Sequence, residues 1–503
     1  MPISPANKYP RAFITVKYGA GRQSPLSAPR KVLVVGYPAV VGGSTATGTN
    51  GIVYPLPSVD DAITYFGGGS EVYEGADAAL NQDAATALYG ISFAEAAGGT
   101  YTEWTLTIAN QATLGGTLSL YVNGRVVEIV ITAGQTANDQ ATAVYNTFIK
   151  YKNLPVYIDQ APGAAVVTFR WKHKGARGTQ MTLRYKVEGI TTSTYTLVQS
   201  QAGITDANPN TGALDKIAAK DFDYIICPDN TSSATVGIKQ FVTYADNRAD
   251  PLTSLRGVIV AATKDTYANA VTLATAVNAH RCFLIWARNF EDSTMRIAAR
   301  YGAAVASGTS ADPTANINFL KLKSVYGPVL ESDWITEIEA TNALNNGLSC
   351  ARFTPQGACF VPRPITSRFQ DVNGNPDYRT LDVGKVLMPD YMADFWEQDI
   401  PVSWEGYKLR DDDPNDNGEP MEKVCTPKLF KSYLAGGLRR EYKLGRLKNP
   451  EVYINGEGTG GGGNGGQLDV KIHASVDSRL VCDVPLDIIA IFAQAEMTLR
   501  QVG

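Results

Sequence analysis

Histidine is scarce in this chain, and cysteine never occurs in a spacing typical of a metal site. The 503 residues include three histidines and six cysteines. The histidines are His173, His280 and His473, and the cysteines are Cys227, Cys282, Cys350, Cys359, Cys425 and Cys482. No C-x-x-C pair occurs, and a zinc site or a histidine relay would need ligands from distant parts of the chain. We therefore predict no metal, no cofactor and no catalytic residue, and we interpret the cysteines as reduced thiols.

The chain also lacks a long apolar run and an excess of positive charge. No stretch of about 18 apolar residues occurs, as a membrane span would need. The N-terminal sequence MPISPANKYPRAF is polar and proline-rich, unlike a signal peptide. The net charge of -4 provides no positive field to hold a nucleic acid. We expect a soluble, non-secreted protein with no nucleic-acid partner and no membrane insertion.

Basic residues cluster beside aromatic residues at 170–178 and 438–448. Contact with a nucleic acid is one interpretation of such clusters. We favour contacts between subunits, in which patches of opposite charge meet.

The first thirty residues contain five prolines and one strand-like segment. Side chains of alternating character run over residues 11–18, with Ala12, Phe13, Ile14, Val16 and Tyr18 as the candidate arm residues. A single strand before any core has no local partner, so we predict that residues 1–30 form an arm that pairs elsewhere. Pairing of the terminal strands within their own chain remains the alternative.

Strands and helices alternate in two separate stretches, 31–97 and 205–331. The run KVLVVG at 31–36 is typical of a strand buried on both faces, and Ser58 and Gly67–Gly69 bound a helix that precedes a second helix. Between the stretches, residues 98–204 are rich in β-branched and aromatic residues, with one amphipathic helix at about 136–151. We predict an α/β core with a largely parallel sheet, interrupted by an inserted, mostly β domain.

Residues 332–485 contain both helix-like and strand-like sequence patterns, which predict an α+β C-terminal domain. Its glycine-rich segment 456–466 is predicted to be a linker. The acidic loop at 411–418 partly imitates a calcium loop that starts at Asp413, but its twelfth position is Val424, where a glutamate is needed. Residues 371–377 are predicted to be a turn. Residues 486–503 form a predicted C-terminal arm strand. Its candidate arm residues are Ile489, Ile491, Ala493, Ala495, Met497 and Leu499.

Six strings of the sequence occur in an order that resembles the tail sheath family of contractile phages, as found in phage Mu and its relatives. The strings are DAITYFGGGS (61–70), YIICPDN (224–230), YADNR with RGVIVAAT (244–263), TNALNNGLS (341–349), PRPITSRFQDVNGNPDYRTLDV (362–383) and VPLDIIAIFAQAEMTLR (484–500). Each string alone is weakly specific, but together they extend over more than four hundred residues.

The resemblance implies a structural protein, not an enzyme, with a subtilisin-like sheath core, an outer inserted domain and terminal arms that add strands to neighbouring subunits. It implies hexameric rings stacked around an inner tail tube, baseplate and tail terminator proteins as partners, assembly in the bacterial cytoplasm and a place in the virion tail. The family's ITT-like segment corresponds to Ile365, Thr366 and Ser367. Two alternatives remain open: the sheath of a phage-derived bacteriocin or related injection device, and a hydrolase with a subtilisin-like core.

Overall fold

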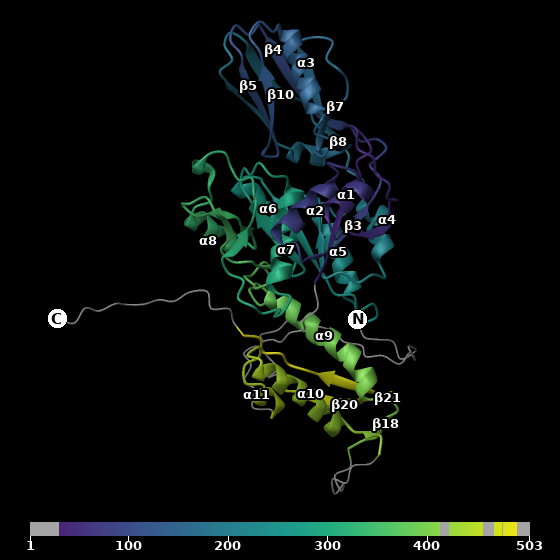
Figure 1. Cartoon of the computed structure of the whole chain (residues 1–503). Coiled ribbons are helices and arrows are strands. Elements are labelled where there is room, and N and C mark those ends of the chain that lie inside the picture. Colours follow the sequence, from purple (N-terminus) through teal and green to yellow (C-terminus); the bar gives the residue numbers. More distant parts are fainter. Residues whose placement is uncertain (1–29, 413–421, 456–466, 475, 490–503) are drawn as a thin grey trace, which may run out of the picture.

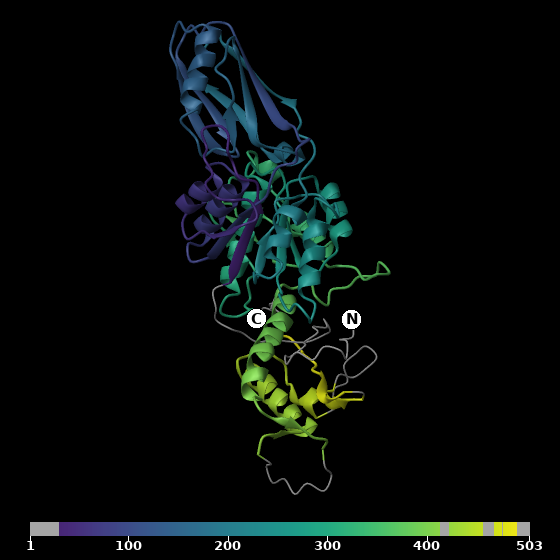
Figure 2. The same ribbon diagram turned by 90° about the vertical axis from the view of Figure 1, so that its right-hand side faces the viewer.

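A computed structural model describes residues 30–412, 422–455, 467–474 and 476–489. The protein is a mixed α/β molecule with several sheets, drawn out along one axis (Figures 1 and 2). A unit of antiparallel sheets lies at one end and a large, mainly parallel sheet with its helices lies in the middle. A small lobe at the other end is reached through helix α9.

The central sheet contains seven strands in the order β15-β13-β12-β11-β1-β3-β2. Its strands are β1 (Lys31–Gly36), β2 (Val53–Pro55), β3 (Ala87–Ser92), β11 (Tyr224–Ile226), β12 (Val258–Thr263), β13 (Cys282–Trp286) and β15 (Ser349–Cys350). All neighbours pair in parallel except β2, which runs antiparallel to β3. The first strand, β1, lies in the middle of the sheet, between strands from both predicted core stretches.

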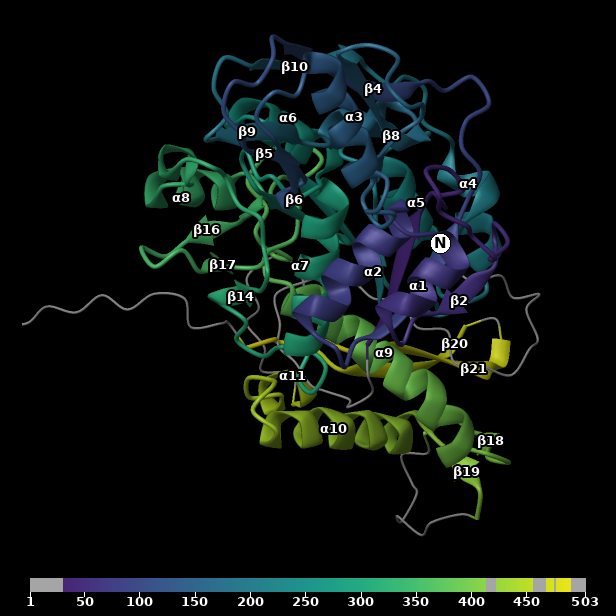
Figure 3. The same ribbon diagram turned by 45° about the horizontal axis from the view of Figure 1, so that its top comes forward.

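Helices cover both faces of this sheet (Figure 3). These helices are α1 (Val59–Phe66), α2 (Glu71–Gln82), α5 (Ile238–Arg248), α6 (Tyr267–Val277) and α7 (Thr294–Gly308), and α8 (Glu337–Asn345) lies beside the sheet. Alternate strand residues enter different hydrophobic clusters: Leu33 and Val35 face one layer, and Val32 and Val34 face the other. A strand buried on both faces needs apolar residues at every position, which explains the continuous run at 31–36.

The predicted helix–turn–helix after β2 is confirmed by α1 and α2. Ser58 accepts a hydrogen bond from the Asp61 amide, and the Asp61 carboxylate accepts one from the Ser58 amide, which completes a capping box. Gly67 follows α1 at a φ of 83°, where a side chain is strained, and a Cβ there would lie 2.2 Å from the Ala39 carbonyl oxygen.

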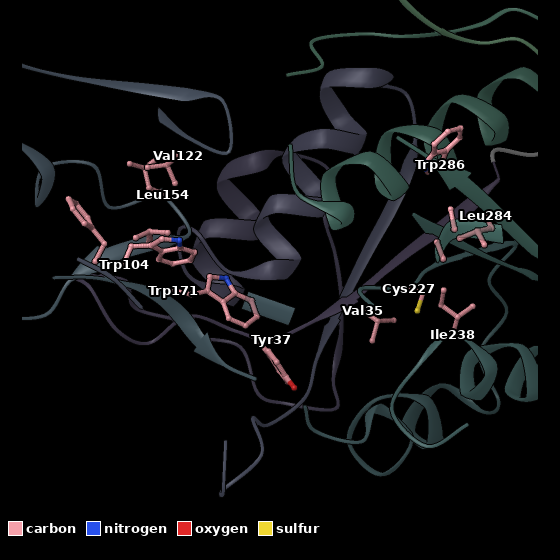
Figure 4. Packing of buried hydrophobic residues seen from close by; sticks show 14 of the residues in the cluster. Val35, Tyr37, Trp104, Val122, Leu154, Trp171, Cys227, Ile238, Leu284 and Trp286 are labelled. Carbon is pink, nitrogen blue, oxygen red and sulfur yellow. The ribbon is translucent and has the colours of Figure 1, made fainter. Parts of the chain in front are cut away.

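Seven strands and one helix form the antiparallel unit. They are β4 (Tyr101–Ala109), β5 (Gly116–Val122), β6 (Arg125–Ile131), α3 (Ala137–Phe148), β7 (Val156–Ile158), β8 (Val166–Lys174), β9 (Leu183–Glu188) and β10 (Thr194–Gln201). They build a four-stranded sheet, β10-β4-β8-β7, and a three-stranded sheet, β6-β5-β9. One hydrophobic cluster continues from this unit into the central sheet, with Trp104 and Trp171 on one side and Leu284 and Trp286 on the other (Figure 4).

Two further parts of the molecule are a small three-stranded sheet and the C-terminal lobe. The sheet contains β14 (Leu320–Leu322), β16 (Arg352–Phe353) and β17 (Cys359–Val361). The lobe contains α9 (Gly384–Ser403), β18 (Lys408–Leu409), β19 (Val424–Cys425), α10 (Pro427–Lys443), α11 (Glu451–Ile454), β20 (Asp469–His473) and β21 (Val476–Asp483). Its apolar residues make a separate cluster that includes Met388, Trp396 and Leu434.

Two features of the second half of the chain differ from what the sequence pattern predicts. Strand β15 pairs with β13 in the central sheet, although it lies beyond the domain boundary predicted near residue 332. Helix α9 is the longest described helix, and the sequence pattern did not predict it. Pro389 and Pro401 lie inside it, and its apolar residues are spread around the axis, so it lacks the one-sided pattern that predicts a helix.

Candidate functional site: the contacts that join the layers

A buried arginine connects the antiparallel unit to the central sheet. Arg177 lies in the 3-10 turn Ala176–Gln180 after β8, and its guanidinium stacks 4.2 Å from the ring centre of Tyr37. Three carboxylates surround it: Glu71 at 3.3 Å, Asp206 at 3.5 Å and Asp229 at 3.6 Å. Glu71 begins α2 and Asp229 follows β11, so one side chain of the inserted segment links two parts of the core.

Burial controls the ionisation of these carboxyl groups. It raises the pKa of Glu71, and the positive charge of Arg177 opposes this shift. Burial likewise raises the pKa of Asp229 to about 7. Without Arg177, both carboxyl groups would be buried with no compensating cation at this position, which is strongly unfavourable for their charged forms.

Lys172 makes a second connection, through neutral acceptors. Its Nζ donates hydrogen bonds to Ser44 Oγ at 2.7 Å, the Gly68 carbonyl at 2.7 Å and the Lys152 carbonyl at 2.5 Å. The side chain is almost completely buried, and burial lowers the pKa of Lys172 to about 7. Lys172 thus holds together the β8 strand, the turn between α1 and α2, and the loop after α3.

The basic segment 170–178 was expected to be a patch for contacts between subunits. This prediction is wrong for Lys172, His173 and Arg177, because all three are buried within the chain. His173 Nδ1 lies 3.2 Å from the Glu95 carboxylate. Positive charge in a sequence does not reveal whether the cation is exposed or meets a buried acceptor, so only the tertiary contacts decide this point.

More ion pairs connect the three-stranded sheet to the core. Arg125 of β6 pairs with Glu74 of α2, and Arg184 of β9 pairs with Glu291. Arg296 of α7 binds Asp77 at 2.5 Å and Asp292 at 2.9 Å. Apart from the local pair between Arg296 and Asp292, which are four residues apart, these pairs join segments far apart in the sequence, and no local pattern predicted them.

A ladder of carboxylates on α9 connects the C-terminal lobe to the central sheet. Asp390 accepts two hydrogen bonds from Arg281, at 2.6 and 2.8 Å. Arg256 binds Asp394 at 2.6 Å and Glu397 at 2.8 Å. The three acids occupy positions i, i+4 and i+7, which share one face of a helix. Both arginines are buried, so the orientation of α9 relative to the sheet depends on these pairs.

The ITT-like segment lies against the central sheet, and all three of its residues are buried. The Ile365 amide donates to Ser349 Oγ at 2.9 Å, and Thr366 Oγ1 donates to the Thr380 carbonyl at 2.9 Å. Ser367 Oγ donates to the Ala279 carbonyl at 3.0 Å. Serine therefore supplies the hydroxyl at the position where the family pattern has its second threonine.

The predicted arm residues lie mostly outside the described residues. This holds for Ala12, Phe13, Ile14, Val16 and Tyr18, and for Ile491, Ala493, Ala495, Met497 and Leu499. Ile489 is described and partly buried, and its neighbour Ile488 forms an antiparallel bridge with Leu447. The arm assignment stays a prediction.

The described ranges contain no cluster of three or more His, Cys, Asp or Glu side chains that could hold a metal ion. No helix within them is both long enough and apolar enough to cross a membrane. The predicted turn at 371–377 is confirmed: the Asp371 carboxylate accepts hydrogen bonds from the amides of Asn373 and Asn375. Most of the acidic loop from Asp413 lies outside the part of the chain that the structure describes.

The chain is similar in sequence to a known phage protein. No family model matches the chain. The chain is 24% identical over 442 residues to the Mu-like prophage FluMu tail sheath protein of Haemophilus influenzae, which covers 86% of this chain and 87% of that protein. The chain thus resembles a tail sheath protein of a Mu-like prophage over most of its length.

Two solved structures of sheath tail proteins are also similar to this one. The protein from Desulfitobacterium hafniense has a TM-score of 0.43 and 14% identity, covering 92% of this chain and 93% of its own. The protein from Listeria innocua has a TM-score of 0.38 and 13% identity, covering 76% and 79%.

Proposed function

We propose that this sheath protein polymerises into stacked hexameric rings around an inner tail tube and contracts to drive that tube through a host envelope. In this mechanism the free energy of contraction resides in contacts between subunits, and the chain performs no catalysis. Its partners are further copies of itself, the tube protein, and the baseplate and tail terminator proteins. The similarity to the Mu-like prophage tail sheath protein supports the proposal.

The observation that carries the strand-exchange part of the proposal is the β20–β21 hairpin in the C-terminal lobe. Within the described residues, this sheet has only two strands. Two-stranded sheets are marginally stable, and their open edges are templates for further strands. The terminal segments 11–18 and 489–499 alternate in the way that strand addition requires, with main-chain hydrogen bonds for strength and side chains for register. We propose that each arm adds a strand to the lobe of a neighbouring subunit.

The proposed domain organisation follows the layers of the molecule. Residues 98–204 form the outer inserted domain, and 31–97 with 205–331 form the core. Strand β15 supports extension of this core beyond residue 331. The change of cluster within α9, from Leu387 to Met388, supports a C-terminal domain that begins inside this helix.

Deletion of residues 1–20 tests the arm. We expect a folded, soluble subunit that no longer forms long cylinders in negative-stain electron microscopy, because the link between rings is lost. A matched pair of variants tests whether one face of the arm strand makes the contact. Ile14→Asp with Val16→Asp should stop cylinder growth. Thr15→Asp with Lys17→Asp, on the other face of the strand, should not. Cylinders of normal length from the deletion variant would contradict the arm assignment.

A bacteriocin or related injection device would use the same subunit mechanics. Genes for genome packaging beside this gene would support a phage tail, and their absence from an otherwise complete tail cluster would support the alternative.

A further inference from the structure

Two exposed apolar surfaces of opposite charge lie on different parts of the chain. The first is the segment 329–338, which contains the 3-10 turn Glu331–Asp333 and the first residues of α8, and is called the α8 ridge here. The second is the exposed side of α10, called the α10 face, which contains Lys428, Leu429, Ser432, Gly436, Arg440 and Lys443. The ridge lies beside the central sheet and α10 lies in the C-terminal lobe (Figures 1 and 3).

The α8 ridge is apolar and acidic. Ile338 is 75% exposed, and Val329 and Leu330 are each 60% exposed. Glu331, Asp333 and Glu337 provide negative charge, and the segment contains no lysine or arginine. Large apolar side chains exposed at this level beside charged residues are typical of a surface that binds another protein.

The α10 face is apolar and basic. Leu429 is 46% exposed and Leu444, just beyond the helix, is 53% exposed. Lys428 and Lys443 lie on or near the same side. Arg440 also lies there, but it is paired at 2.7 Å with the buried Glu441, the single acid of the helix. The charge of this surface is therefore opposite to that of the ridge.

Gly436 gives an independent reason to expect a close contact at α10. It lies inside the helix, is exposed, and has no heavy atom within 4 Å of the position that a Cβ would occupy. Glycine at such a position costs about 1 kcal/mol of helix stability relative to alanine. The missing side chain leaves room for another chain to approach the helix backbone.

We propose that the α8 ridge of one copy docks on the α10 face of a second copy. This inference rests on the proposed assembly and specifies one of its interfaces. A contact between two different surfaces of the same chain is heterologous, and repeated copies of it build a ring or a helix. The acidic ridge meets the basic helix, and the apolar side chains of both surfaces are removed from water.

Charge reversal tests the contact. The ridge variant carries Glu331→Lys and Glu337→Lys, and the helix variant carries Lys428→Glu and Lys443→Glu. We expect each variant alone to need at least about tenfold more protein for assembly than the wild type, since about 1.4 kcal/mol of lost interface energy has this effect. A one-to-one mixture should assemble again, because each altered surface then meets a complementary partner. Sedimentation and negative-stain microscopy measure this, with Glu128→Lys on the exposed side of β6 as the control.

Gly436→Gln is a second variant that leaves the charge unchanged. We expect it to stabilise the isolated subunit, because glutamine favours a helix, and to weaken assembly, because its side chain fills the space left for the partner. Reversal variants that assemble like the wild type would overturn this inference and leave the proposed function intact. A wild-type protein that forms no oligomers under any condition would overturn both.

Discussion

At the scale of single residues, burial decides what each charged side chain does. Lys172 and Arg177 are close in the basic segment 170–178, yet Lys172 meets neutral acceptors and Arg177 meets three carboxylates. The sequence indicated positive charge at this place but not its partners. Those partners come from residues between 44 and 229, which only the folded chain brings together.

The pKa of Lys172 leads to a pH-dependent prediction. Its pKa is lowered to about 7 from the ordinary value of 10.5, so between these pH values the unfolded chain binds a proton that the folded chain releases. The free energy of unfolding therefore rises with pH across this window. Lys172→Met should abolish this contribution, so that the wild type gains stability relative to the variant as the pH rises from 7 to 10. Urea unfolding at several pH values measures the difference, with Lys174→Met as the control. A difference that does not change with pH would contradict the prediction.

At the scale of elements, the strands and helices of the core follow from local pattern, whereas α9 does not. The run KVLVVG and the capping box at Ser58 are local features, and both gave the expected element. Helix α9 contains two prolines. It is apolar on several sides because it passes from one hydrophobic cluster into another. Its helical structure depends on packing that a sequence window does not contain.

The ion pair between Arg281 and Asp390 should contribute strongly to the attachment of α9. Arg281→Met leaves the buried Asp390 without its bidentate partner, and we expect a loss of about 3–5 kcal/mol in the free energy of unfolding. Arg439→Met removes a pair with Glu451 in which both side chains are at least 40% exposed, and we expect a change below about 1 kcal/mol. Denaturant unfolding followed by tryptophan fluorescence compares the two variants. An equal loss of unfolding free energy in the two variants would contradict a strong contribution of the Arg281–Asp390 pair to the attachment of α9.

At the scale of the whole molecule, the inserted unit and the core share one hydrophobic cluster and several buried ion pairs. The two ends of the insertion lie side by side, because the Thr100 amide donates to the Ile204 carbonyl at 3.3 Å. Such adjacent ends are what an insertion into an existing fold requires. The insertion is nevertheless attached to the core through buried contacts as well as through its two connections.

Replacement of residues 98–204 by a short glycine–serine linker tests this attachment. We expect the shortened chain to be less stable than the full chain above pH 7, because Glu71 and Asp229 lose Arg177 while they remain in the core. Adding Glu71→Gln and Asp229→Asn should restore part of the stability, since neutral groups no longer need a cation. Thermal unfolding at pH 8 compares the three proteins. No recovery with the two added substitutions would contradict the importance assigned to the Arg177 contacts.

The sequence by itself determined the α/β class, most core strands and helices, the stretch of β structure between them and the resemblance to tail sheath proteins. These features depend on local periodicity, on capping residues and on the order of short sequence strings, which can all be read along a single chain. Only the tertiary structure decided the position of β1 inside the sheet, the place of β15, the helical structure of α9 and the burial of Lys172, His173 and Arg177. Each of these depends on contacts between residues far apart in the chain, whose free energy no local window contains.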